Sequence, residues 1–299
     1  ARYTEKIYDY VWKDDFADAR NYSFSKAAMD YIYCADADEV LDEVNRERFL
    51  ALKQVLEGEV DVVQMYYCNQ LRYNTVYNYD REYRPKLYKR MRTFRFEDPV
   101  HEMVRLDPVI YDSEIEIMHL PTSPHGARDL DNFEKMTREG KTVSKRLHGM
   151  YAKELFIVGT ERNFMNARAF FEESAQDENR TEEELQQAFC VLARAARLSD
   201  DRDAFFKYTL RSAAGGGCAE ICCELGDYYL HREDYEEAAL WYSNAAYETE
   251  CILNRRYQEV YPLEQLAVCY EACQNKQAAE QFRKQAEENE RRMCEQPQE

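Results

Sequence analysis

The sequence predicts an α/β segment followed by an all-helical segment. Residues 1 to about 120 mix short runs of β-branched and aromatic residues with amphipathic helical runs. From Asp129 onward Ala, Glu, Arg, Gln and Leu dominate, and the β-branched runs disappear. The 299 residues also amount to about two domains at the usual ~150 residues per domain. Because the composition changes around residues 121–126, we expect domains of residues 1–125 and 126–299.

The first segment alternates predicted strands with predicted helices. Helices are expected at 16–29, where Asp14 and Asp15 suit the N-terminus, and from an Asn45 cap to residue 57, with Gly58 as the C-terminal stop. The expected strands are 6–12, 31–35, 60–68, 87–96 and 109–119. Strand–helix–strand order implies crossover connections, so we expect a mainly parallel sheet.

The helical segment contains a repeat. Leu225, Gly226 and Tyr229, followed by Ala238 and Tyr242, have the spacing of a tetratricopeptide unit. Close-approach alanines recur at Ala167, Ala204, Ala238 and Ala279, at intervals of 37, 34 and 41 residues. We therefore expect stacked helical hairpins whose concave face binds an extended partner and which unfold with nearest-neighbour character. An ordinary irregular helical domain is the alternative.

Composition excludes several classes of protein. The net charge of −18 repels nucleic acid, so we expect no nucleic-acid partner. No apolar run approaches the ~18–20 residues of a membrane-spanning helix, and the chain does not open on a signal peptide, so a soluble protein is expected. The cysteines that fall in helical apolar patterns, at 190, 222, 223, 269 and 273, read as buried thiols in preference to a zinc site. Free thiols favour a reducing, cytoplasmic compartment.

One acidic motif suggests chemistry. The apolar strand at 31–35 is followed directly by Asp36-Ala37-Asp38. Two carboxylates at positions i and i+2 of an extended chain point the same way, at a sheet edge where ligands bind in open α/β folds. They suit a hard divalent cation, which neutralises a diphosphate. Acidic turns after strands are common, so this motif alone is a weak signal.

Several further stretches share an order with a known family. These are residues 12–24 (WKDDFADARNYSF), the Asp36–Glu39 run, 83–88 (YRPKLY), 94–97 (FRFE), 100–102 (VHE) and 115–119 (IEIMH). Together they resemble family 2 glycosyltransferases of GT-A type, and most closely the bacterial subgroup that carries a tetratricopeptide tail. The resemblance covers about residues 4–120 and continues into the helical tail. That family begins with a β-α-β unit that has no counterpart here, so the chain resembles the later part of a GT-A domain.

The resemblance implies a nucleotide-sugar site. Asp38 would bind Mn²⁺ or Mg²⁺, and Asp36 would contact the ion through water or hold the ribose. His119 would be a further ion ligand, or equally an edge histidine with one hydrogen bond. Arg20 and Asn21 would bind nucleotide or phosphate oxygens, unless they form a solvated helix face.

The same resemblance implies an inverting displacement, which needs a base for the acceptor hydroxyl. Glu102 is the expected base; alternatively His101 acts and Glu102 orients it, or the two form a structural pair. The expected function is transfer of a sugar from a nucleotide donor to an unknown glycan, lipid-linked or protein acceptor. The helical repeats would recruit that acceptor or another protein or peptide. The competing hypotheses are a non-catalytic tetratricopeptide scaffold with an incomplete transferase remnant, and a tetratricopeptide-bearing part of another α/β enzyme.

Overall fold

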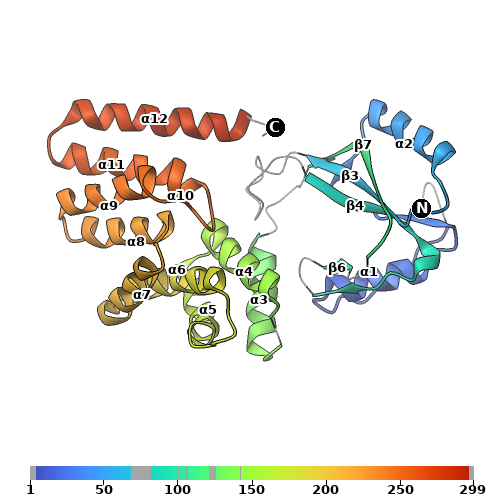
Figure 1. Cartoon of the computed structure of the whole chain (residues 1–299), viewed down its shortest axis with the longest axis horizontal. Helices are drawn as coiled ribbons and strands as arrows, with labels where there is room; N and C mark the ends of the chain where they lie inside the picture. The colour runs from blue at the N-terminus through green and yellow to red at the C-terminus, as the bar shows by residue number, and fades with distance from the viewer. Residues whose placement is uncertain are drawn as a thin grey trace. The chain divides into compact units, whose positions relative to one another are not determined.

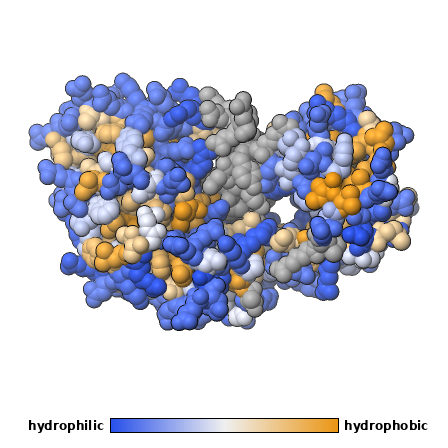
Figure 2. Space-filling view, in the orientation of Figure 1, coloured by the Kyte–Doolittle hydropathy of each residue, from blue (hydrophilic) through white to orange (hydrophobic). Residues whose placement is uncertain are grey.

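The computed structural model describes residues 5–68, 82–99, 102–104, 107–120, 126–141 and 143–295. The chain forms two compact units, which divide between residues 124 and 125. Unit 1 is mixed α/β and unit 2 is all-helical, which confirms the predicted order of the two classes (Figure 1). On the face drawn in Figure 2, hydrophilic residues predominate over both units and hydrophobic residues gather in smaller patches. Each described helix is too short or too polar to span a lipid bilayer.

The main sheet of unit 1 has the strand order β1-β4-β3-β7-β2. Its strands are β1 (Tyr31–Tyr33), β2 (Glu39–Val40), β3 (Val62–Cys68), β4 (Glu82–Lys89) and β7 (Ile110–His119). Only the β3–β7 pair is parallel among these strands, so the expectation of a mainly parallel sheet is wrong. Strand β4 follows β3 after residues 69–81 alone and pairs with it antiparallel, an arrangement that needs no crossover helix.

Two helices pack against this sheet. Helix α1 (Phe16–Ser25) contributes Ala17 and Phe24 to a core with Val62, Tyr88, Phe94 and Phe96. Helix α2 (Glu43–Val55) contributes Leu52 to a second core with Val63, Met65, Leu87, Ile115 and Ile117. Adjacent residues Val62 and Val63 belong to different cores, as expected for a strand whose side chains alternate between two faces. The sheet is therefore covered on both sides.

Several boundaries differ from the sequence expectation. Asp15 caps α1 as expected, but α2 is capped by Asp42 and not by Asn45. Asn45 is buried, and its side-chain oxygen accepts the backbone N–H of Glu116 on β7 at 2.9 Å. Residues 6–12 form no strand; Tyr10 there donates to Asp18 of α1. The predicted strand at 87–96 is divided into β4, the 3₁₀ helix η2 (Arg90–Arg92) and β5 (Phe96–Glu97), which pairs with β6 (Met103–Val104).

Unit 2 is a succession of helices. Neighbouring helices pack together along the chain, in the pairs α6–α7, α8–α9 and α11–α12 among others. The helices are α3 (Gly126–Arg138), α4 (Lys145–Val158), α5 (Glu161–Ser174), α6 (Glu182–Leu198), α7 (Arg202–Ala214), α8 (Ala219–Leu230), α9 (Tyr235–Tyr247), α10 (Arg256–Glu259), α11 (Tyr261–Ala272) and α12 (Lys276–Glu295).

The repeat residues lie at close contacts between helices. Ala238 and Ala279 are buried, on α9 and α12. Gly226 of α8 lies against the ring of Tyr242 on α9, so close that a Cβ on Gly226 would come within 2.6 Å of it. The assignment at Ala204 is wrong, because Ala204 is half-buried and its neighbour Phe205 takes the fully buried position on α7.

The cysteines of unit 2 mostly pack as small apolar residues. Cys190, Cys222, Cys223 and Cys269 are buried, as expected, whereas Cys273 is exposed because it caps the C-terminus of α11. Burial raises the pKa of the Cys222 and Cys269 thiols to about 11, which keeps them protonated near neutral pH.

Candidate functional site

The acidic motif connects β1 to β2, the two outer strands of the unit 1 sheet, and therefore lies along the strand ends. We call this row of strand ends the sheet edge. The backbone fixes it there, since the Cys34 N–H donates to the Lys86 carbonyl and the Leu120 N–H donates to the Asp38 carbonyl, both at 2.8 Å. Strand β4 thereby brings Lys86, and β7 brings His119, to the same edge as Asp36 and Asp38.

Arg20 of α1 connects Glu102 to this motif. Its Nε and Nη2 lie 2.7 and 2.5 Å from Glu102 Oε1, and its Nη2 lies 3.3 Å from Asp36 Oδ1. Its Nη1 donates to Cys34 Sγ, and the guanidinium lies over the Phe96 ring. Burial opposes the charge, but Glu102, Cys34 and Asp36 together raise the pKa of Arg20, so it stays cationic. The structure thus brings together three residues that the sequence predicted separately.

Lys86 forms the second cation of the site. It is 5% exposed, ion-paired with Glu39, and has its Nζ 3.7 Å from Asp36 Oδ2 and 5.0 Å from the centroid of the Tyr67 ring. Burial acts to raise the pKa of Asp36, but Arg20 and Lys86 outweigh it and lower that pKa. Burial dominates at Glu39 and raises its pKa despite Lys86. Asp36 is therefore an ionised carboxylate with one oxygen toward each cation.

His119 and Asp38 face each other beside this cluster. His119 Nε2 lies 3.5 Å from Asp38 Oδ2, and the His119 ring stands 5.1 Å from that of Tyr67. A carboxylate oxygen and an imidazole nitrogen at this separation are ligand types that Mn²⁺ accepts. Asp36 fits such an ion less well, because both of its oxygens already contact cations.

Asn21 makes two contacts with the backbone of β5. Its amide donates to the Phe96 carbonyl at 2.9 Å, and its side-chain oxygen accepts the Phe96 N–H at 2.8 Å. In this structure Asn21 therefore holds β5 against α1, and its nucleotide contact stays a prediction. His101 lies outside the described residues, as does most of the tyrosine-rich stretch between β3 and β4.

Sequence reasoning missed Lys86, Glu39 and Tyr67 as site residues. Lys86 is the clearest omission, because a lysine that directly precedes the apolar strand residues Leu87 and Tyr88 must find a partner if the strand is buried. That signal was present in the sequence.

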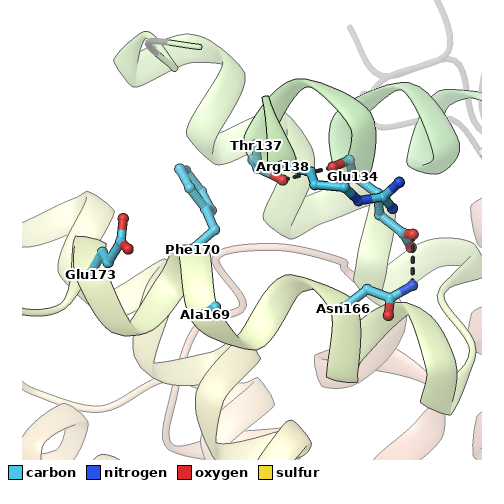
Figure 3. Close-up of a pocket in the computed structure, with 7 residues that line it drawn as sticks. All are labelled: Glu134, Thr137, Arg138, Asn166, Ala169, Phe170 and Glu173. Carbon is cyan, nitrogen blue, oxygen red and sulfur yellow. Dashed lines mark hydrogen bonds between the residues drawn. The ribbon is translucent and has the colours of Figure 1, made fainter. Parts of the chain in front are cut away.

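Unit 2 contains a hollow of about 250 Å³ between α3 and α5 (Figure 3). It is lined by Glu134, Thr137, Arg138, Asn166, Ala169, Phe170 and Glu173. The Glu134 carboxylate accepts hydrogen bonds from the side-chain amides of Asn163 and Asn166, each at 2.7 Å, which accounts for its burial. None of the motif residues lies here.

Another group of ligand-type atoms occurs in unit 2. The side-chain atoms of Cys190, Cys218 and Glu220 lie within 4.8 Å of one another and are buried. The Glu220 carboxylate is already occupied by three backbone N–H groups, so the group does not require an ion.

Comparison with known proteins leaves the family open. No family model and no curated protein matches the chain. Among solved structures, the crystal structure of MamA is similar, with 15% sequence identity and a TM-score of 0.39 over 57% of this chain and 94% of that chain. A likeness this distant assigns no function.

Proposed function

We propose that unit 1 is the diphosphate-binding part of a GT-A-type glycosyltransferase and that unit 2 recruits the acceptor or another partner. The observation that carries this proposal is the convergence of Arg20, Lys86 and the Asp36–Asp38 motif at one sheet edge. Two fixed cations beside an acidic motif are the groups that a nucleotide diphosphate and its counterion require.

Arg20 and Lys86 would bind phosphate oxygens. Both cations now contact Asp36, at 3.3 and 3.7 Å, distances at which an incoming phosphate competes with the carboxylate. Glu102 keeps Arg20 oriented through contacts to Nε and to Nη2, the nitrogen that also lies near Asp36. Arg20 therefore needs no large rearrangement to present a donor to the ligand.

Asp38 and His119 are the residues proposed to hold Mn²⁺ or Mg²⁺. Such an ion, when bound, supplies positive charge to the leaving diphosphate. The carboxylate and imidazole already lie together at the sheet edge. Packing against Tyr67 fixes the His119 ring in that position.

Glu102 is the proposed base, but its ion pair limits it. Glu102 Oε1 lies 2.7 and 2.5 Å from two guanidinium nitrogens of Arg20, so this ion pair must open before Glu102 contacts an acceptor hydroxyl. If it stays closed, Glu102 is a positioning residue for Arg20. The two roles differ in kinetics, because a base affects kcat whereas a positioning residue affects the KM for the donor.

The test uses a panel of nucleotide sugars and measures release of nucleoside diphosphate. Glu102→Gln should lower kcat ~100-fold with an unchanged donor KM if Glu102 is the base. A raised KM with near-normal kcat assigns positioning instead. Glu114→Gln, an exposed glutamate on β7, is the matched control and should change neither.

A non-catalytic scaffold is the second candidate, and one observation favours it. Arg20, Lys86, Glu39 and Glu102 are all satisfied by one another or by Asp36, as in a purely structural ion-pair cluster. Absence of nucleoside diphosphate release with every nucleotide sugar, together with absence of nucleotide binding, would establish the scaffold.

A further inference from the structure

The connection between α9 and α11 is longer than the repeat requires and is tightly bound. It corresponds to the 41-residue interval between Ala238 and Ala279 and contains α10. The backbone N–H groups of Ile252, Leu253 and Asn254 all donate to the buried carboxylate of Glu220 on α8, at 2.8–3.2 Å. Three charge-assisted bonds to consecutive amides fix this stretch in one conformation.

The same stretch reaches two earlier helices. The side-chain amide of Asn254 donates to the Phe156 carbonyl in the last turn of α4, 98 residues away in sequence. The Tyr257 hydroxyl accepts a hydrogen bond from Arg194 of α6 at 2.7 Å, and its ring packs edge-on against Phe156. Residues 251–259, which we call the strut, thus contact α4, α6 and α8. Since α4 contacts α6 and α6 contacts α8, the strut crosses three helices of one row.

The groups beneath the strut would be costly to uncover. Arg194 is ion-paired to Glu224 at 2.5 Å, and Arg197 bridges Glu224 and Asp227 at 2.7 and 2.8 Å. Glu220 and Glu224 are fully buried. Removing the strut would leave Glu220 without its three N–H donors and Arg194 without the Tyr257 oxygen, and an uncompensated buried charge is strongly destabilising.

Stacked repeats usually bind their partners on an extended concave face. Helices α6 and α8 are the first helices of the pairs α6–α7 and α8–α9, and α4 continues their row. We propose that this row lines the concave face of unit 2 and that the strut permanently fills it, so that a partner of unit 2 binds elsewhere and the helices from α4 to α11 unfold together. This inference does not depend on the function of unit 1.

Hydrogen exchange of the full chain tests the proposal. In the unmodified protein, protection factors in residues 252–259 should lie within ~3-fold of those in α8, because both exchange by the same global opening. Exchange in the strut ~100-fold or more faster than in α8 would overturn the proposal, since the strut would then be a displaceable lid.

A matched pair of variants tests the coupling to α4. Glu220→Gln should accelerate exchange at least ~10-fold both in residues 252–254 and in residues 154–158 of α4. Glu250→Gln, at an exposed position next to the strut, should change neither. Acceleration confined to residues 252–254 would contradict a shared unfolding unit. If Glu220→Gln does not fold, Asn254→Ala removes the hydrogen bond to the Phe156 carbonyl of α4, together with the Arg256 N–H contact inside the strut, and should accelerate exchange in 154–158.

Discussion

Replacing Gly226 with Ala tests the helix packing of unit 2 at its closest contact. In an exposed helix this change stabilises by up to ~1 kcal/mol, because Gly is a poor helix former. Here the new Cβ would lie 2.6 Å from Cε1 of Tyr242 and 2.7 Å from Cδ1 and Cζ. Gly226→Ala therefore has two opposing effects on stability: a gain from higher helix propensity and a loss from overpacking against Tyr242.

The Tyr242 ring is unable to move away. It is fully buried, and its hydroxyl donates to Asp227 at 2.6 Å, an oxygen that Tyr261 also contacts at 2.7 Å. Overpacking a closed core costs ~1–3 kcal/mol. Displacing the ring also weakens a hydrogen bond to a charged group, worth ~1.5–3 kcal/mol. Less the gain in propensity, we expect a net loss of about 2–4 kcal/mol.

Urea unfolding of the full chain, followed by circular dichroism at a helix band, measures this loss. Gly58→Ala is the control, since a Cβ there meets no atom within 4 Å, and it should change stability by less than ~0.5 kcal/mol. If Gly226→Ala proved as stable as the unmodified chain, the close approach of α8 and α9 would be refuted.

Two further predictions concern unit 2. Burial lowers the pKa of His148 to about 4, although a hydrogen bond with the Gln187 side chain acts to raise it, so the folded state binds fewer protons than the unfolded state between pH 4 and 6.5. The contribution of His148 to stability should fall by about 3 kcal/mol as the pH drops through that window, and His148→Gln should remove this contribution. Burial raises the pKa of Glu154 to about 8, which makes stability rise as the pH drops, in the unmodified chain and in the His148→Gln variant alike. The difference between the urea midpoints of these two proteins therefore reports on His148 alone. Parallel pH dependences of the two midpoints would contradict a buried, neutral His148. Residues 126–295 expressed alone should be monodisperse and helical by circular dichroism, because their cores are built from their own residues; aggregation would contradict a separate unit.

Local spacing predicted the helix pairs of unit 2 well. Leu225-Gly226 and the later Tyr242 specify how α8 and α9 pack, because the Tyr242 ring lies directly against the small residue Gly226. The strut was not predictable from spacing, which showed only a longer interval. Its contacts with Phe156 and Arg194 join residues 98 and 63 positions apart, and no local pattern encodes them.

Unit 1 shows the same limit at its sheet. Periodicity located β3 and β7, but strand pairing depends on partners distant in sequence, and β1 pairs with β4. Asn45 and Asp42 are both residue types that cap helices well. In the structure Asp42 caps α2, and the Asn45 side-chain oxygen accepts the backbone N–H of Glu116 on β7 instead. Lys86 was not predicted as a site residue, and its partner Glu39 lies 47 positions away in sequence. Residue types thus predicted the acidic motif, and tertiary contacts determined which cations surround it.

Thermal unfolding with Mn²⁺ and uridine diphosphate tests the proposed site most directly. Ligand bound to the folded state alone stabilises it by about 2.7 kcal/mol at 100 times its Kd, so the melting temperature of the unmodified chain should rise. Asp38→Asn should abolish the rise, whereas Asp112→Asn, an exposed position nearer the start of β7, should retain it. An unchanged melting temperature in the unmodified chain, at millimolar concentrations of both ligands, would contradict a nucleotide diphosphate site at this sheet edge.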